Sequence, residues 1–196
     1  MRLTQKGEKT IKAVVLLSGG IDSMACVYFY KNQGYEIECV FCDYGQPAAK
    51  YELMSATRIA KYYGVPLHQI TVTESKGNYR GEICARNAML AIQAFFYTGY
   101  GAYKIITGIH DGTDYADCTK IFVDAINRVL DCYANGKVIL EAPFIDMCKA
   151  DIINYCEKES LPISMTYSCE AGCFPPCGKC PSCLDRKEYL NEQCIS

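Results

Sequence analysis

The segment Ser18-Gly19-Gly20-Ile21-Asp22-Ser23 constrains the fold of this chain more than any other stretch, because of what flanks it. An apolar run over residues 11–17 precedes it, and a helical pattern over residues 24–33 follows it. Two glycines let the backbone of a turn come close to a ligand, with successive N–H groups pointing at it. The start of the helix adds the positive end of its dipole. This order of strand, glycine-rich turn and helix predicts a site for phosphate or pyrophosphate.

We call the turn of residues 18–23 the phosphate loop. Three of its side chains suggest further contacts with a phosphate and its metal ion. Ser18 and Ser23 bring hydroxyls, and Asp22 is the loop's one carboxylate and a candidate Mg²⁺ ligand. The pattern is neither a Walker loop nor a dinucleotide-binding turn. It resembles the S-G-G-x-D-S loop of the PP-loop ATP pyrophosphatases, which bind ATP and release pyrophosphate. The resemblance implies catalytic roles for the two serines and Asp22. It implies ATP contacts along the whole segment: Leu17, Ser18, Gly19, Gly20, Ile21, Asp22 and Ser23.

Length and composition set the limits. A chain of 196 residues, half of them hydrophobic, predicts one domain with room for a small appendage. No apolar run approaches the roughly 20 residues of a membrane span, and residues 1–12 lack the apolar core of a signal peptide. The net charge of −2 provides no general attraction for nucleic acid. We therefore expect a cytoplasmic protein that does not bind a membrane, and we do not expect nucleic acid as a partner.

Strand-like and helix-like segments alternate along the chain, which predicts an α/β fold with a five-stranded parallel sheet and helices on both faces. Polar loops are expected at 73–84, where the chain should be mobile, and at 110–118. The helix at 86–97 is mostly apolar and is expected to be buried. The helix expected at 120–133 should have one face that packs on the core, formed by Phe122, Ile126, Val129 and Leu130. The expected strands cover residues 11–17, 35–42, 67–72, 104–109 and 138–140, and the expected helices 24–33, 47–64, 86–97, 120–133 and 149–158.

Several chemically active turns follow the expected strands directly. They are the phosphate loop, the turn at Asp43, the loop at His110 and the segment after Leu140. In parallel sheets, ligands bind at the carboxyl ends of the strands. The sequence therefore predicts one shared site at that edge.

Fourteen cysteines are many for a chain without a signal peptide. Those at 26, 39, 42, 132 and 156 lie in apolar segments and are expected to be small buried hydrophobes in a reducing compartment. The C-terminal ones differ, because Cys177, Cys180 and Cys183 form a C-x-x-C-x-x-C run. With Cys169 they predict a structural Zn²⁺ site of four thiolates, and Cys173 is the alternative fourth ligand. An iron–sulfur cluster and a redox C-x-x-C are the competing interpretations. We expect residues 166–196 to form a zinc-binding tail packed on an ATP-binding domain of residues 1–165.

Further motifs follow the phosphate loop in a set order. They are Asp43-Tyr44-Gly45-Gln46, Ile83-Cys84-Ala85-Arg86-Asn87, Tyr115-Ala116-Asp117-Cys118 and the cysteine run. This order, over nearly the whole chain, resembles the 7-cyano-7-deazaguanine synthase (QueC-like) family. The resemblance implies an adenine nucleotide alpha hydrolase-like (HUP, PP-loop) fold with strand order 3-2-1-4-5, a structural zinc on four cysteines, and a homodimer. It implies an ATP-dependent carbon–nitrogen ligase that adenylates 7-carboxy-7-deazaguanine and combines it with ammonia, giving the amide and then the nitrile, a queuosine precursor.

The resemblance also implies site residues outside the phosphate loop. Lys149 matches a lysine placed near the phosphates, although a solvated lysine in a first helical turn would look the same. Arg86 and Asn87 would contact substrate or phosphate, or else form a polar pair with a structural partner. Asp117 would bind the amino edge of the deazaguanine, or else cap a helix. Other nucleotide and substrate contacts are expected from Asp43, Tyr44, Gln46 and Gly108.

The chain departs from the family pattern mainly around the acceptor. Cys84 and Ala116 stand where the family has proline, Thr119 where arginine is common, and His110 where asparagine is typical. Pro47-Ala48 replaces Arg-His, and the loop from Gly108 to Cys118 is about two residues short in that comparison. One alternative is therefore a paralogue of an antiviral defence system that conjugates the acid to a protein amine. Another is a tRNA-thiolating PP-loop enzyme, which the missing RNA-binding domain and basic face disfavour.

Overall fold

The computed structural model describes residues 11–72, 83–112 and 115–190 of the chain. Most of the loop expected at 73–84 lies outside these residues. Within them, a five-stranded sheet has the order β3-β2-β1-β4-β5, and every neighbouring pair is parallel. The strands are β1 (Lys12–Leu16), β2 (Glu36–Asp43), β3 (Leu67–Thr71), β4 (Tyr103–Ile106) and β5 (Val138–Glu141). The predicted fold class and strand order are confirmed.

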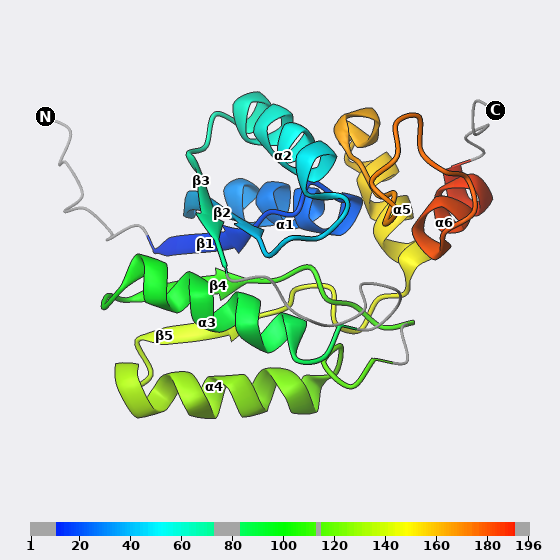
Figure 1. The fold of residues 1–196 in the computed structure, drawn as a ribbon. Helices are drawn as coiled ribbons and strands as arrows, with labels where there is room; N and C mark the ends of the chain where they lie inside the picture. The colour runs from blue at the N-terminus through cyan, green and yellow to red at the C-terminus, as the bar shows by residue number, and fades with distance from the viewer. Residues whose placement is uncertain (1–10, 73–82, 113–114, 191–196) are drawn as a thin grey trace, which may run out of the picture.

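Helices cover both faces of the sheet and extend beyond its carboxyl edge (Figure 1). On one face lie α1, α2 and α5, and on the other α3 and α4, while α6 lies beside α5 past the arrowheads of the strands. The helices are α1 (Ile21–Asn32), α2 (Ala49–Tyr63), α3 (Arg86–Thr98), α4 (Lys120–Ala134), α5 (Lys149–Lys158) and α6 (Pro181–Leu190), with a 3₁₀ turn η1 (Ile163–Met165). In the described residues, no helix is long and apolar enough to cross a membrane.

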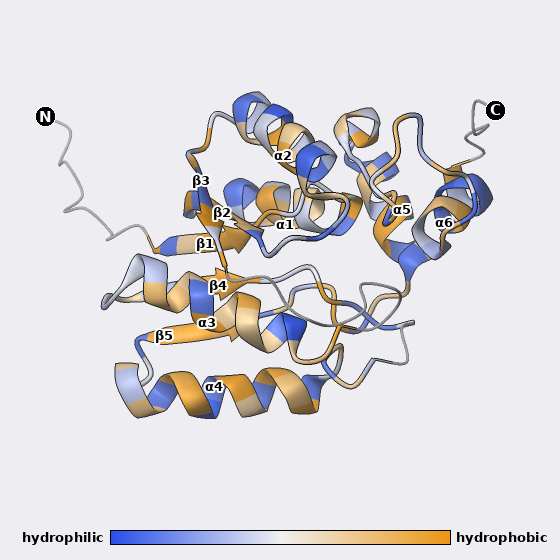
Figure 2. Ribbon diagram, viewed as in Figure 1, coloured by the Kyte–Doolittle hydropathy of each residue, from blue (hydrophilic) through white to orange (hydrophobic). Residues whose placement is uncertain are grey.

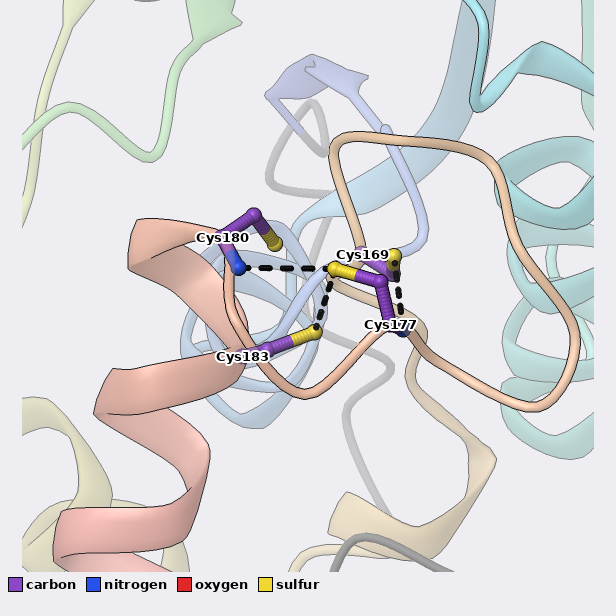
Figure 3. Close-up of side chains that lie close together, drawn as sticks. All are labelled: Cys169, Cys177, Cys180 and Cys183. Atoms are coloured by element: carbon purple, nitrogen blue, oxygen red, sulfur yellow. Dashed lines mark hydrogen bonds between the residues drawn. The ribbon is translucent and has the colours of Figure 1, made fainter. Parts of the chain in front are cut away.

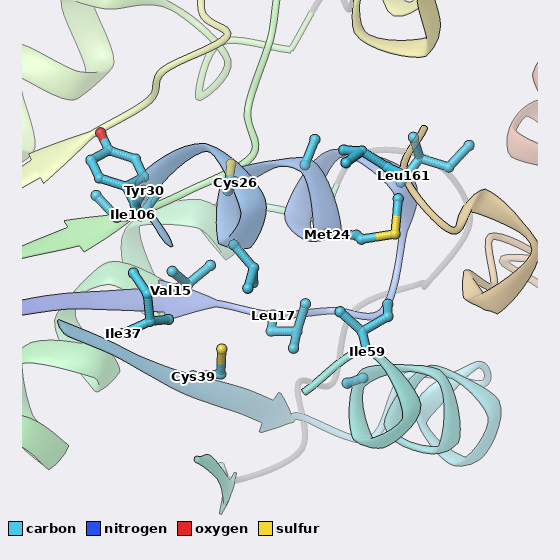
Figure 4. Close-up of a cluster of buried hydrophobic side chains, with 14 of the residues drawn as sticks. Val15, Leu17, Met24, Cys26, Tyr30, Ile37, Cys39, Ile59, Ile106 and Leu161 are labelled. Carbon is cyan, nitrogen blue, oxygen red and sulfur yellow. The ribbon is translucent and has the colours of Figure 1, made fainter. Parts of the chain in front are cut away.

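The central strand β1 is buried on both faces, as its apolar sequence requires. On one face, Val15 and Leu17 pack with Met24 and Cys26 of α1 and with Ile59 of α2 (Figure 4). The other face packs under α3 and α4, and β1, β4 and β5 are coloured apolar along most of their length (Figure 2). The two clusters hold β1 rigid up to the point where the phosphate loop begins.

Residues at the helix ends account for where α2 and α4 stop and where α4 starts. Gly64, at φ 63°, ends α2, and Asn135, at φ 48°, ends α4; both residue types tolerate this left-handed conformation. Thr119 caps the start of α4 through a hydrogen bond from the Phe122 N–H, at 3.1 Å.

The structure corrects several boundaries. The first helix begins at Ile21 and not at Met24, so Asp22 and Ser23 belong to its first turn. The fourth strand ends at Ile106 instead of Ile109, since the chain turns away to bring Gly108 against α1. The tail contains α6, which the sequence analysis did not predict, because the cysteines and charges of residues 177–190 conceal its weak periodicity.

Three expectations about burial were wrong. Cys132 is exposed on α4, and Val129, expected on the core face, is 44% exposed. The buried residues of that helix are Ile126, Leu130 and Ala134. Helix α3 is not buried as a whole, since Phe96 is 82% exposed. Periodicity identified both helices, but their rotation against the sheet was set by packing.

Candidate active site

A cavity of about 360 Å³ opens at the carboxyl edge of the sheet. Loops after β1, β2 and β4 contribute to its wall, together with Lys149 at the start of α5 and the tail. The predicted single site at this edge therefore corresponds to a real cavity. Twelve of the predicted site residues line it: Leu17, Ser18, Gly20, Ile21, Asp22, Ser23, Tyr44, Gln46, Arg86, Asn87, Gly108 and Lys149.

The phosphate loop is held by its own hydrogen bonds and by close packing. The hydroxyls of Ser18 and Ser23 lie 3.1 Å apart, and the Ser23 hydroxyl donates to the Gly20 carbonyl at 3.1 Å. Gly19 has φ +86°, and a Cβ there would lie 2.5 Å from the Glu52 carbonyl oxygen of α2. Only glycine fits this position. The contact with α2 and these hydrogen bonds therefore fix the backbone of the loop.

Asp22 and Lys149 form an ion pair in the cavity wall. The Lys149 Nζ donates to both carboxylate oxygens, at 2.6 and 2.7 Å, and both side chains are about three-quarters buried. The interpretation of Lys149 as a solvated surface lysine is therefore wrong. Because α5 begins with Lys149 and α1 carries Asp22, the pair joins two helices at the cavity.

Gln46 and Glu52 form a polar cluster near Arg86, just after β2 in the sequence. The buried Gln46 accepts from the Tyr44 N–H at 3.0 Å and donates to the Cys42 carbonyl at 3.2 Å and to Glu52 Oε2 at 2.9 Å. Burial raises the pKa of Glu52, and the hydrogen bond from Gln46 and the charge of Arg86 oppose this rise. Glu52 lines the cavity and was missed by the sequence analysis. Its position in the first turn of the helix after Gln46 was the available signal.

Asp117 takes the second of the two roles that the sequence left open, that of a helix cap. Its carboxylate accepts from the Asn87 backbone N–H at 3.1 Å, and the Asn87 amide donates to the Asp117 carbonyl at 3.2 Å. Asp117 thus caps α3 and ties it to the loop before α4, whose own cap is Thr119. Within the described part of the chain, Asp117, Gly19 and Asp43 are not among the lining residues. Asp43 accepts from the Gly45 N–H at 3.1 Å and shapes the turn instead.

The side chains of Cys169, Cys177, Cys180 and Cys183 form the cysteine cluster (Figure 3). All four sulfur atoms lie within 4.8 Å of one another, and those of Cys177 and Cys183 are 4.0 Å apart. Tetrahedral zinc with Zn–S bonds of about 2.3 Å needs sulfurs roughly 3.8 Å apart. The donor set therefore fits such an ion with small adjustments. Cys173 is exposed, and Cys169 takes the fourth position.

Backbone N–H groups favour thiolates in the cluster. Burial raises the pKa of Cys169, but hydrogen bonds, first among them the one from the Cys177 N–H at 3.3 Å, outweigh it and lower the pKa to about 6. N–H groups of Lys179 and Cys180 likewise lower the pKa of Cys177. A thiolate is the form that binds metal. Burial instead raises the pKa of Cys180 and of Cys183, so the thiolate form is favoured at Cys169 and Cys177 only.

The cysteine cluster is continuous with the cavity. Cys169 and Cys183 pack with Ala48 and Tyr167, and the Tyr167 N–H donates to the Gly19 carbonyl of the phosphate loop at 2.9 Å. Gly172 has φ +65°, and a Cβ there would lie 2.1 Å from the Pro47 carbonyl oxygen. The sequence analysis did not predict that the tail also supplies cavity wall, through Tyr167, Ser168, Glu170, Ser182, Asp185 and Arg186.

The loop after β4 completes the wall with residues that had been noted only as departures or motif members. His110, Tyr115 and Cys118 line the cavity. Cys118 lies 3.7 Å from the Asn87 amide nitrogen and so belongs to the same contact as Asp117. Of the residues that depart from the family pattern, His110 lies in this part of the wall, whereas Pro47 and Ala48 line the cavity where the tail packs against it.

Comparison with known proteins agrees with this geometry. The model of the family described as queuosine biosynthesis protein QueC matches residues 12–79 and 73–194. The 7-cyano-7-deazaguanine synthase of Archaeoglobus fulgidus is 35% identical, with 91% of this chain and 85% of the relative covered. That of Oceanobacillus iheyensis is 31% identical, with 92% and 94% covered.

A solved structure of the NH3-dependent NAD synthetase from Campylobacter jejuni is similar with a TM-score of 0.50 and 15% identity, over 81% of this chain and 68% of that one. At this identity the likeness concerns the fold alone. The sheet order, the phosphate loop and the matching family model define an α/β protein of the PP-loop class. Within that class, the chain belongs to the queuosine biosynthesis protein QueC family.

Proposed function

We propose that this protein uses ATP to activate 7-carboxy-7-deazaguanine and combines it with ammonia, giving the amide and then the nitrile 7-cyano-7-deazaguanine. The observation that carries the proposal is the cavity at the carboxyl edge of the sheet. It brings the phosphate loop and the Asp22–Lys149 pair together with the polar groups around Arg86. Curated relatives that match nearly the whole chain bear the name of this synthase.

The reaction needs both the phosphate loop and the polar groups around Arg86. A carboxylate reacts with ammonia only after one oxygen has become a good leaving group, and transfer of AMP to that oxygen supplies it. Ser18, Gly20 and Ser23 would hold the pyrophosphate that leaves, through hydroxyl and backbone donors. Mg²⁺, when bound, neutralises phosphate charge, and Asp22 is its candidate ligand. Lys149 would then exchange part of its contact with Asp22 for a phosphate oxygen.

The acceptor would bind on the side of Arg86, whose guanidinium suits the carboxylate of the acid. Asn87 and Asp117 would act mainly by fixing the start of α3, since they bind one another. Glu52 lines the cavity and is better placed than Asp117 to accept the N–H groups of a guanine-like edge. Tyr44 and Gln46 support Glu52 from the turn after β2.

The remaining parts are structural. Zn²⁺ in the cysteine cluster would fasten the tail to the domain, because binding free energy of a structural metal is also folding free energy. We further propose the homodimer that the family resemblance implies.

The test is pyrophosphate release from ATP with a panel of acceptors. With the acid and ammonia, we expect pyrophosphate, AMP and a nitrile of the corresponding mass. Transfer to a protein amine would instead give a partner heavier by the deazaguanine acyl group, and the altered loop of His110 and Tyr115 is the reason to include that arm. Release of pyrophosphate with tRNA alone would contradict the proposal.

A further inference from the structure

The loop after β4 connects the two sides of the cavity. At its start, Gly108 lies against the phosphate loop, since a Cβ there would come within 3.1 Å of the Asp22 backbone. At its end, the Asp117 carboxylate accepts from the Asn87 N–H at 3.1 Å, in the first turn of α3. A side chain of this loop that lines the cavity is therefore placed between the groups that would hold the phosphates and those that would hold the acceptor.

His110 is such a side chain, and its ring is held in one orientation. It is half-buried and lines the cavity, and its Nδ1 is hydrogen-bonded to the Asp111 backbone carbonyl. Because a carbonyl oxygen can only accept, Nδ1 carries the hydrogen of this bond. In the neutral ring the second nitrogen, Nε2, is then an acceptor. Within residues 11–72, 83–112 and 115–190, the only hydrogen bond of this ring is the one at Nδ1.

The carboxylates of the cavity are less suited to receive a proton from the acceptor side. In the described part of the chain, those that line the cavity belong to Asp22, Glu52, Glu170 and Asp185. The first three already accept hydrogen bonds from neighbouring side chains, and the last two belong to the tail. A histidine changes between its neutral and charged forms near physiological pH, so it can take up and release a proton within one turnover. His110 is therefore the stronger candidate for a base.

We propose that His110 accepts, at Nε2, the proton that ammonia loses when it attacks the activated acid. The inference rests on the proposed function, in which ammonia attacks an acyl adenylate. The lone pair of ammonia forms the C–N bond while the carbonyl electrons move to oxygen. Nε2 takes one proton from the nitrogen. The C–O bond to the phosphate then breaks, its electrons leave with AMP, and the proton passes from His110 to water.

The test separates the two halves of the reaction. Adenylation is measured without ammonia, as acid-dependent exchange of labelled pyrophosphate into ATP, and amide formation by rapid quench after ammonia is added. His110→Ala should exchange pyrophosphate like the wild type but form the amide about 100-fold more slowly, the usual contribution of a general base. Free imidazole should restore about tenfold of this loss, because it can take the proton in place of the missing ring. Asp111→Asn, exposed on the same loop, is the matched control and should leave both rates unchanged.

Rescue by imidazole distinguishes a base from a residue that only shapes the loop. Wild-type amide formation in His110→Ala, or a slow rate that imidazole leaves unchanged, would overturn the proposal. Should His110→Ala fail to fold, His110→Gln decides, because its amide oxygen accepts a hydrogen bond but no proton, and a wild-type rate there also overturns it. Absence of acid-dependent exchange in the wild-type protein would refute the proposed function and this inference with it. Normal exchange with unimpaired variants would refute the role of His110 alone.

Discussion

The phosphate loop and the cysteine cluster are both compact sites, but they are held together in different ways. The loop is six consecutive residues between β1 and α1, and its shape follows from glycine, serine and the start of a helix. The cluster gathers residues from 169 to 183 and lies against the start of α2 and against Tyr167. The loop should therefore tolerate loss of a side chain without unfolding, whereas the cluster should lose stability with a single ligand.

The largest effect is expected at Asp22. Asp22→Ala removes the candidate Mg²⁺ ligand and leaves the Lys149 ammonium without its carboxylate. We expect acid-dependent pyrophosphate release to fall by roughly 100- to 1000-fold, as for the loss of a key electrostatic group. Thermal unfolding should change little. Asp124→Ala, on the exposed side of α4, is the control. Near-normal turnover of Asp22→Ala would show that the loop works without this carboxylate.

Cys177→Ser tests the other region. The variant should lose its metal, and its free energy of unfolding should drop by about 3 kcal/mol, the contribution of a ligand at 100-fold its dissociation constant. For a chain of this size that lowers the melting temperature by roughly 6–12 °C. Cys173→Ser is the matched control, because Cys173 is exposed and outside the cluster. Equal melting temperatures and metal contents for both variants would contradict a metal-held tail.

A pair of glycines sharpens the contrast within the loop. Gly19→Ala places a Cβ 2.5 Å from the Glu52 carbonyl at a positive φ, and should cost about 2 kcal/mol or more of stability. Gly20→Ala meets its nearest atom at 3.6 Å and should change stability by less than about 0.5 kcal/mol. Denaturant unfolding of the two variants measures the difference. Similar losses at both positions would mean that the packing of α2 on the loop is not what fixes its backbone.

The smallest expected effect concerns the acceptor side. Asp117→Ala should remove about 1 kcal/mol by uncapping α3 and raise the KM for the acid, with ATP affinity unchanged. Thr119→Ala uncaps α4 at a similar cost in stability and should leave that KM alone. Steady-state kinetics with the acid varied, and nucleotide titration, separate the two. If both variants change the KM equally, the position of α3 does not control the acceptor.

The same contrast explains what could be predicted from the sequence. Strand order, helix existence and the phosphate loop follow from local patterns, since apolar strands and a glycine-rich turn dictate them. The four cysteines also followed from spacing. The rotation of α3 and α4, which exposes Phe96 and Val129, depends on packing across the sheet. Glu52 and Arg186 reach the cavity because α2 and α6 fold back on it. The position of Glu52 in the first turn after Gln46 was a weak signal of this, and the sequence around Arg186 gave none.

Asp117 illustrates the remaining difficulty. Its residue type suggested either a substrate contact or a cap, and the structure made it the cap of a helix that begins some thirty positions earlier. A contact between two loops that are distant in sequence cannot be predicted from the motifs of either loop alone. The part of the site that differs from the family pattern is thus also the part that sequence describes least well.

The central claim is that the phosphate loop and the acceptor side act on one acid in one cavity. The most direct measurement is the number of AMP molecules formed per molecule of product, with 7-carboxy-7-deazaguanine, ammonia and ATP, together with the mass of that product. The account predicts two AMP for each free nitrile, because the acid and then the amide must each be activated. ATP cleavage that is independent of the acid, or one AMP with the acyl group attached to a protein, would contradict it.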